Sequence, residues 1–166
     1  GIAKANIGKW HVSTPKPSQL KYPNIMGYDH YAGNFSGTLN SYTNWSKITN
    51  GATSTCTNYA TTEQTNDAIN WVKTNRNTQM FLWLAFNAPH TPYHLPPANL
   101  HSDVSLTGTI SDISARPNSY FKAMVQAMDT EIGRLVDSLK SLNLYDNTDI
   151  IFIGDNGDDP LVNQGK

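Results

Sequence analysis

A pair of histidines follows an apolar run in the middle of the chain, and histidine is a residue type that can take part in chemistry. Residues 81–86 are all apolar, and His90 and His94 follow among prolines. A continuously apolar run is typical of a strand covered on both faces, as in the parallel sheet of an α/β structure. Pro89 ends the strand, because proline cannot donate a sheet hydrogen bond. We therefore expect both histidines in a loop at the strand's C-terminal end, where open α/β sheets bind ligands.

A lysine and a histidine, Lys9 and His11, lie close together near the start of the chain. The alternation of Ala3, Ala5 and Ile7 favours a strand there. If this strand continues to His11, the lysine and the histidine share one face. A cation and an imidazole together at a strand end can bind an anion. From spacing alone, a solvated lysine and a locally hydrogen-bonded histidine is the commoner interpretation.

A second run of β-forming residues, 150–153, precedes an acidic residue and an amide. It predicts a second buried strand. Gly154 and Gly157 allow the backbone to turn sharply, so Asp155 and Asn156 project at the strand's end. Carboxylate and amide oxygens suit a hard cation such as Ca²⁺ or Mg²⁺. An ordinary Asp-Asn-Gly turn explains the same residues equally well.

Two helices are expected around the first apolar run. Thr62 or Thr65 can begin a helix that runs to about Asn75, with an apolar face. Residues 118–142 have apolar side chains at steps of three and four, the clearest periodicity in the chain. A helix followed by a buried strand is half of a βαβ unit, which indicates an α/β fold.

The remaining stretches, 13–62 and 95–117, are rich in turn-forming residues. We expect long irregular loops there, with at most short strands in the first, inside one domain spanning residues 1–166. The single cysteine, Cys56, has no basic neighbour in sequence and is interpreted as structural. One cysteine excludes an intrachain disulfide and a cysteine-based zinc site.

The charge balance gives no support for a nucleic-acid or membrane partner. The chain has 12 basic and 13 acidic residues, a net charge of −1. No apolar run reaches the roughly 18 residues that a membrane-spanning helix needs. The sequence begins without Met and stops in a glycine-containing turn, so we expect an excerpt of a longer protein.

Four segments occur in an order that resembles a known family. They are Gly-Lys-Trp-His at 8–11, the apolar run with Ala-Pro-His-Thr-Pro at 81–92, the helical segment 128–135, and the segment 146–157. As an ordered set they resemble the sulfatase family of the alkaline-phosphatase-like superfamily, over nearly the whole chain. The resemblance implies an α/β sandwich with a mostly parallel central sheet flanked by helices.

The resemblance also implies roles for particular residues. Lys9 is similar to the lysine that contacts the sulfate and the nucleophile, and His11 to the histidine that hydrogen-bonds the hydrated aldehyde nucleophile and helps to expel sulfate. His90 resembles the histidine that protonates the leaving oxygen. Asp155 and Asn156 resemble two ligands of the active-site Ca²⁺, for which Mg²⁺ is an alternative.

Two more residues receive expected roles, Lys166 from the resemblance and His94 without a counterpart in the family. Lys166 resembles a second sulfate-contacting lysine, which in the family precedes a Gly-rich segment that this sequence does not contain. His94 is expected to line the substrate pocket. The implied substrates are sulfated carbohydrates or aryl sulfates, and carbohydrate sulfatases are usually exported, so we expect a periplasmic or secreted full-length protein.

The sequence also departs from the family pattern. Sulfatases convert a Cys or Ser in a Cys/Ser-x-Pro-x-Arg context to formylglycine, and neither this motif nor the paired metal-binding aspartates occurs here. We expect both upstream of Gly1, no turnover by this chain alone, and weak Ca²⁺ binding. The alternatives are a phosphodiesterase or phosphonate monoester hydrolase of the same superfamily, and a non-catalytic binding module. A sheet that lacks a strand exposes an apolar edge, so self-association is also expected.

Overall fold

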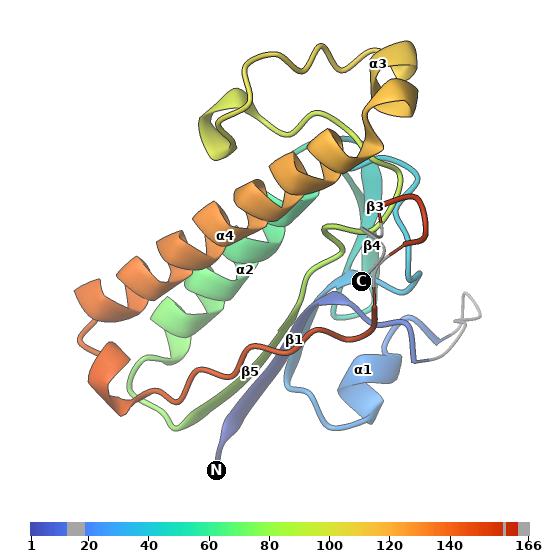
Figure 1. Ribbon diagram of the computed structural model, residues 1–166. Helices are drawn as coiled ribbons and strands as arrows, with labels where there is room; N and C mark the ends of the chain where they lie inside the picture. Colours follow the sequence, from blue (N-terminus) through green and yellow to red (C-terminus); the bar gives the residue numbers. More distant parts are fainter. Residues whose placement is uncertain (13–18, 158, 163–166) are drawn as a thin grey trace.

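A five-stranded sheet forms the centre of the molecule (Figure 1). The computed structural model describes residues 1–12, 19–157 and 159–162. The strand order is β4-β3-β2-β1-β5; β1 pairs in parallel with both β2 and β5, and the β2–β3 and β3–β4 pairs are antiparallel. The strands are β1 (Ala3–Lys9), β2 (His30–Asn34), β3 (Trp45–Thr49), β4 (Ala52–Cys56) and β5 (Met80–Ala85).

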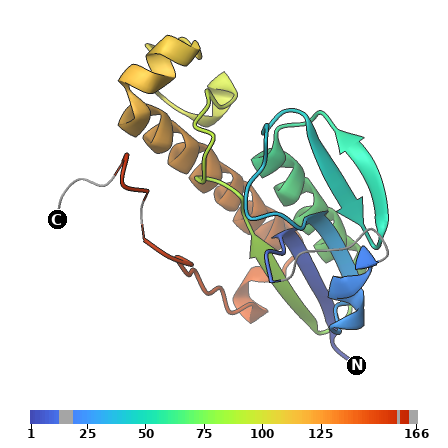
Figure 2. The same ribbon diagram turned by 90° about the vertical axis from the view of Figure 1, so that its right-hand side faces the viewer.

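Two long helices, α2 and α4, lie side by side on one face of the sheet (Figures 1 and 2). The short helix α1 contacts β2, near the aromatic cluster on the opposite face. The helices are α1 (Tyr22–Ile25), α2 (Ala60–Asn75), α3 (Ile110–Ala115) and α4 (Pro117–Ser141), with short 3-10 turns η2 (Ala98–Leu100) and η3 (Tyr145–Asn147). The α/β class and both long helices are confirmed. In the described residues, no helix is both long and apolar enough to cross a membrane.

The contact between α2 and the sheet is built from small residues. Ala5 and Ala32 on neighbouring strands and Ala68 on α2 are fully buried in one cluster. Trp71 and Val72 fill the space further along the helix. Small side chains let the helix approach the strands closely, and the larger ones exclude water from the rest of the contact. The position of α2 thereby fixes the direction of β5, which follows it.

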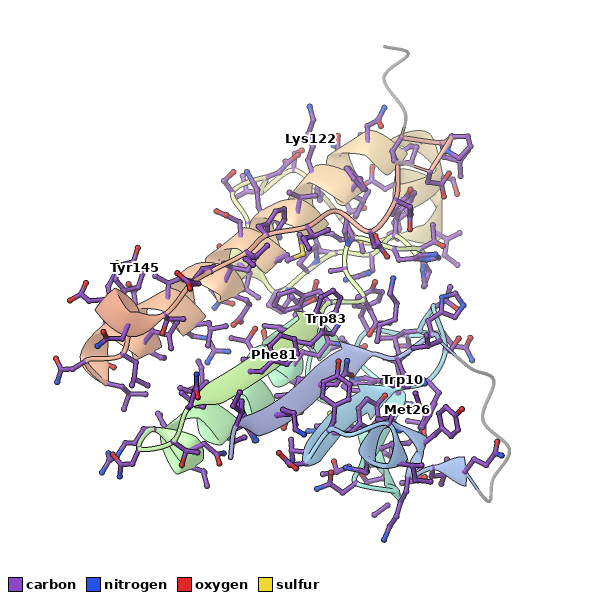
Figure 3. All side chains as sticks on the ribbon, turned by 90° about the horizontal axis from the view of Figure 1, so that it is seen from below. Trp10, Met26, Phe81, Trp83, Lys122 and Tyr145 are labelled. Atoms are coloured by element: carbon purple, nitrogen blue, oxygen red, sulfur yellow. The ribbon has the colours of Figure 1, made fainter. Side chains whose placement is uncertain are left out.

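The burial of β5 differs from the sequence-based expectation. Leu82 and Leu84 pack toward the α2 side, but Phe81 and Trp83 are 49% and 46% exposed (Figure 3). Alternate residues of a strand point to opposite faces. The described chain leaves the face that carries Phe81 and Trp83 about half exposed, so the predicted burial on both faces is wrong for this chain.

The predicted second buried strand is also wrong. Residues 150–153 are 53–80% exposed and are not part of the sheet. They make no backbone hydrogen bond with any described residue. A strand needs a neighbour to satisfy its N–H and C=O groups, and the described chain offers none beside these residues.

The stretch 13–62 is more regular than the expected long loop, because it contains α1, β2, β3 and β4. The missed signal is Asn50-Gly51, which joins β3 to β4 with positive φ angles of 48° and 92°. Asn-Gly is a strong two-residue hairpin signal, since both positions must have positive φ. The Asn50 side chain also accepts a hydrogen bond from the backbone of Tyr31, which ties the turn to β2. The stretch 95–117 is mostly irregular, apart from η2, α3 and the first residue of α4.

A buried carboxylate joins α2 to α4. Glu131 on α4 is only 2% exposed. It accepts hydrogen bonds from the Thr62 hydroxyl at 2.7 Å and from Arg134 Nε at 2.7 Å. Arg134 is therefore the cation that compensates a carboxylate removed from water.

We predict that Arg134→Ala lowers the free energy of unfolding by about 1–3 kcal/mol, because it leaves the Glu131 carboxylate buried without its charged donor. The matched control is Lys140→Ala on the same helix, which removes an exposed pair with Asp137 and should cost about 0.5 kcal/mol or less. Urea unfolding measures both. Equal losses for the two variants would contradict this role for Glu131.

Candidate active site

A cavity of about 210 Å³ lies at the C-terminal ends of β1 and β5. At about 30 Å³ per water molecule it holds roughly seven waters, enough space for a tetrahedral anion. The end of β1, the loop after β2, the loop after β5 and the segment after η3 all contribute to it. Its lining residues are Lys9, His11, Ser36, Gly37, Thr38, His90, Asp155 and Asn156. The structure therefore brings together five of the residues singled out from the sequence.

The end of β1 bends so that Lys9 and His11 reach the same cavity. Gly8 has a φ of 100°, and a Cβ there would overlap the carbonyl of Ala85 on β5. The strand ends at Lys9, and His11 has a left-handed φ of 43°. The expectation that strand alternation alone puts these two side chains on one face is therefore wrong. The bend at Gly8 and the left-handed turn at His11 bring them together instead.

An ion pair closes one side of the cavity. Lys9 Nζ lies 2.6 Å from Asp155 Oδ2, joining the end of β1 to the segment after η3. The lysine side chain is 19% exposed and the aspartate 65%. The hydrogen bond from Lys9 lowers the pKa of Asp155, while partial burial opposes the shift. The carboxylate is thus held ionised at the cavity wall.

The ring of His11 lies against a glycine. A Cβ at Gly37 would lie 2.6–2.9 Å from three atoms of the His11 imidazole. The loop that carries Gly37 is tied to the end of β2, because the Asn34 amide donates to the carbonyl of Ser36 at 2.6 Å. A larger residue at position 37 would therefore require the His11 ring to move from this position.

Hydrogen bonds hold the backbone of His90 at the other side of the cavity. The Tyr42 hydroxyl donates to the His90 carbonyl at 2.8 Å, and the His90 N–H donates to Asn87 O at 2.9 Å. Nδ1 of His90 lies 3.1 Å from the carbonyl of Thr91. A carbonyl can only accept, so a hydrogen bond at this contact needs a proton on Nδ1, and the Thr91 hydroxyl lies 3.2 Å from the same nitrogen.

His94 is a candidate residue that the structure places away from the cavity lining. His94 stacks on Tyr42 at 4.2 Å, and its Nε2 is 3.0 Å from the hydroxyl of Tyr59. Burial lowers the pKa of His94, which fits a support for Tyr42 and hence for the backbone of His90. Cys56 is buried in the core, and burial raises the pKa of its thiol. Lys166 lies outside the described residues.

The metal-binding capacity of this site is partial. Asp155 and Asn156 offer oxygen donors at one wall. The described residues contain no group of three or more His, Cys, Asp or Glu that could hold a metal ion. Ca²⁺ takes six to eight oxygen ligands. The donors present are of the chemical kind that a hard cation prefers, but two residues are too few to complete such a site.

Sequence reasoning missed Ser36, Gly37 and Thr38. They follow β2, in a stretch expected to be irregular. The available signal was a run of small polar residues that ends a strand. That signal has meaning only once β2 is known to lie beside β1.

Comparisons with known proteins indicate the family to which the chain belongs. The family model "Sulfatase" matches residues 1–164. The uncharacterized sulfatase YdeN of Escherichia coli K12 is 28% identical over 99% of this chain and 33% of its own length. The arylsulfatase of Klebsiella aerogenes is 26% identical over 54% of this chain and 28% of its own length. The crystal structure of Ps i-CgsB has a TM-score of 0.69 and 28% identity, covering 88% of this chain and 35% of that one.

The chain therefore belongs to the sulfatase family, and its fold is alkaline-phosphatase-like. It spans about a third of the length of YdeN and of Ps i-CgsB.

We predict that Lys9→Ala raises the pKa of Asp155, because the ammonium that favours the carboxylate is removed. In the unchanged chain the folded-state pKa is the lower one. The pair therefore stabilises the fold above the unfolded-state pKa, and this contribution is lost as pH falls through the folded value. NMR titration of the Asp155 carboxyl measures the shift. Lys73→Ala, on α2, should leave the pKa of Asp155 unchanged. An equal shift in both variants would contradict the pairing of Asp155 with Lys9.

Gly37→Ala is predicted to displace the His11 ring, because the added methyl would occupy its position. The matched control is Gly133→Ala on α4, where a Cβ would meet nothing within 4 Å. For Gly133→Ala we expect the free energy of unfolding to rise by about 0.5–1 kcal/mol, because alanine is more favourable than glycine in a helix interior. Ring signals of His11 in NMR spectra should move in the first variant and stay in the second. An unmoved ring in Gly37→Ala would show that the contact is not limiting.

Proposed function

We propose that the full-length protein containing this chain hydrolyses sulfate esters. The observation that carries the proposal is one cavity, sized for a tetrahedral anion, that gathers a lysine, two histidines and an aspartate from three parts of a sulfatase-family chain. Loss of sulfate from an ester spreads negative charge over the sulfate and leaving oxygens. Preplaced cations and N–H donors stabilise that charge.

Each residue has a proposed part in this chemistry. Lys9 Nζ binds a sulfate oxygen, and Asp155 keeps the ammonium at the cavity wall. His11, held against Gly37, hydrogen-bonds the nucleophile and helps sulfate to leave. His90 acts in its doubly protonated form: it delivers the Nε2 proton to the leaving oxygen and is left as a neutral ring with its proton on Nδ1, where the contact with the Thr91 carbonyl fixes the ring.

We further propose that Asp155 and Asn156 contribute two ligands to a Ca²⁺ site, with Mg²⁺ as an alternative. A divalent cation there would supply Lewis-acid stabilisation of the sulfate oxygens. The formylglycine nucleophile and the remaining metal ligands are expected outside residues 1–166, and Lys166 is proposed as a second sulfate-contacting lysine. The isolated chain should then have no turnover.

The proposed substrate is a sulfated carbohydrate, with an aryl sulfate as the simpler alternative. Ps i-CgsB, also solved in complex with k-i-k-neocarrahexaose, is 27% identical to this chain with a TM-score of 0.66 in that structure. Its bound oligosaccharide supports this choice. Export to a periplasm or to the outside of the cell is proposed on the same grounds.

The test uses the full-length protein and measures release of sulfate from an aryl sulfate and from a sulfated oligosaccharide. His90→Ala should lower kcat by about 10²–10⁴-fold, the usual contribution of a general acid. His30→Ala, at the opposite end of β2, should leave kcat unchanged. Full activity of His90→Ala would refute its role. Faster cleavage of a phosphate diester than of either sulfate would favour the phosphodiesterase alternative, and no hydrolysis of any ester would favour a binding module.

A further inference from the structure

The imidazole of His90 depends on its own loop for its position. The side chain is exposed at the cavity, and its hydrogen-bond contacts with described residues are both to Thr91, the next residue in the chain. A contact inside the same loop moves with that loop, so it does not fix the ring relative to Lys9 and His11. The loop, residues 86–97, contains no helix or strand. The place of the ring is therefore set by whatever holds the loop backbone.

Two buried side chains from other parts of the fold hold this backbone. The Tyr42 hydroxyl donates to the His90 carbonyl at 2.8 Å. Gln64, fully buried on α2, donates from Nε2 to Asn87 Oδ1 at 2.7 Å. The carbonyl of Asn87 in turn accepts from the His90 N–H at 2.9 Å. Both backbone groups of His90 are thus tied, the carbonyl directly and the N–H through Asn87.

Tyr42 is itself held rigidly. Its side chain is buried, and its carbonyl accepts from the N–H of Ala60, the first residue of α2, at 2.8 Å. Its ring stacks on that of His94, with ring centroids 4.2 Å apart. Burial raises the pKa of Tyr42, so the hydroxyl keeps its proton and remains a donor. The hydroxyl therefore offers a fixed donor to the loop.

His94 completes this support as a neutral ring. Its Nδ1 lies 2.9 Å from the carbonyl of Pro92, and a carbonyl can only accept, so this bond needs a proton on Nδ1. Burial lowers the pKa of His94 and favours the neutral form. In that form Nε2 carries the lone pair and accepts from the Tyr59 hydroxyl at 3.0 Å. Both edges of the ring that stacks on Tyr42 are thereby held.

We propose that Tyr42 is a positioning residue for His90: its hydroxyl holds the loop where the His90 imidazole meets the leaving oxygen of the ester. This rests on the proposed function, because it requires His90 to act as the general acid. A misplacement of about 1 Å can cost about 10²-fold in rate. The tie through Gln64 remains when the Tyr42 hydroxyl is removed, so the loop should shift and the loss should fall on proton transfer.

A purely structural role for the hydroxyl makes a different prediction. A buried carbonyl needs a donor in any case, and Tyr42 would then serve only to satisfy it. Removing the hydroxyl would lower stability and affect every substrate to the same degree. The dependence of the loss on the leaving group therefore separates the two roles.

The test is Tyr42→Phe in the full-length protein, which keeps the stacked ring and removes the hydroxyl. With a sulfated oligosaccharide, whose alcohol needs a proton to leave, kcat/KM should fall about tenfold or more. With para-nitrophenyl sulfate, whose phenolate leaves without one, the loss should be about twofold or less.

The matched control is Tyr120→Phe. Tyr120 is fully buried, and its hydroxyl donates to Asp112 at 2.6 Å and accepts from the Gly108 N–H at 2.8 Å. None of these residues lines the cavity. This variant loses buried hydrogen bonds without a link to His90, so kcat/KM should stay unchanged for both esters.

A second measurement does not depend on hydrolysis. NMR spectra of the full-length protein with labelled histidine, in which His90→Ala assigns the His90 signal, report the surroundings of the ring. The signal should move in Tyr42→Phe and stay in Tyr120→Phe. An unmoved signal in Tyr42→Phe would overturn the proposal, whatever the activity.

The kinetic outcomes separate the two proposals. Equal losses with both esters, or no loss in a protein that hydrolyses them, would overturn the role of Tyr42 and leave the proposed function standing. No hydrolysis of either ester by the unchanged protein would refute the proposed function, and the role of Tyr42 with it. A loss confined to the oligosaccharide, with a shifted His90 signal, is the result that supports both.

Discussion

The close approach of three backbones at the end of β1 is the constraint on which the site depends. A Cβ at Gly8 would overlap the carbonyl of Ala85, and a Cβ at Gly33 would overlap the carbonyl of Gly8. The three residues occupy one register row across β2, β1 and β5. Glycine at two of the positions lets the strands stay paired while β1 turns. Lys9 and His11 are aimed at the cavity by that turn.

The rest of the molecule holds this row in place. Helix α2 packs on the face that carries Ala5 and Ala32, and α4 is joined to α2 through the buried Glu131. Tyr42, from the loop between β2 and β3, supports the backbone of His90. Contacts made far from the cavity therefore decide where its charged groups lie, as expected for a site built at the ends of parallel strands.

Much of this could be predicted from the sequence. Apolar periodicity predicted both long helices, and the run at 81–86 predicted β5. The ordered motifs indicated five of the cavity residues. The misses have a common cause. Strand pairing depends on two segments, and the sequence of one segment does not show its neighbour. Residues 150–153 have strong strand propensity but no described neighbour to pair with. Ser36–Thr38 can be recognised as site residues only when β2 is known to lie beside β1. The Asn50-Gly51 hairpin was available in the sequence and was overlooked.

The measurement that tests the central claim most directly is a crystal structure of the full-length protein with a sulfated oligosaccharide bound. The account predicts the sulfate group in the cavity, with Lys9 Nζ on a sulfate oxygen and His90 Nε2 within hydrogen-bond distance of the ester oxygen. A sulfate group bound elsewhere, with Lys9 and His90 not contacting it, would contradict the assignment of this cavity as the active site.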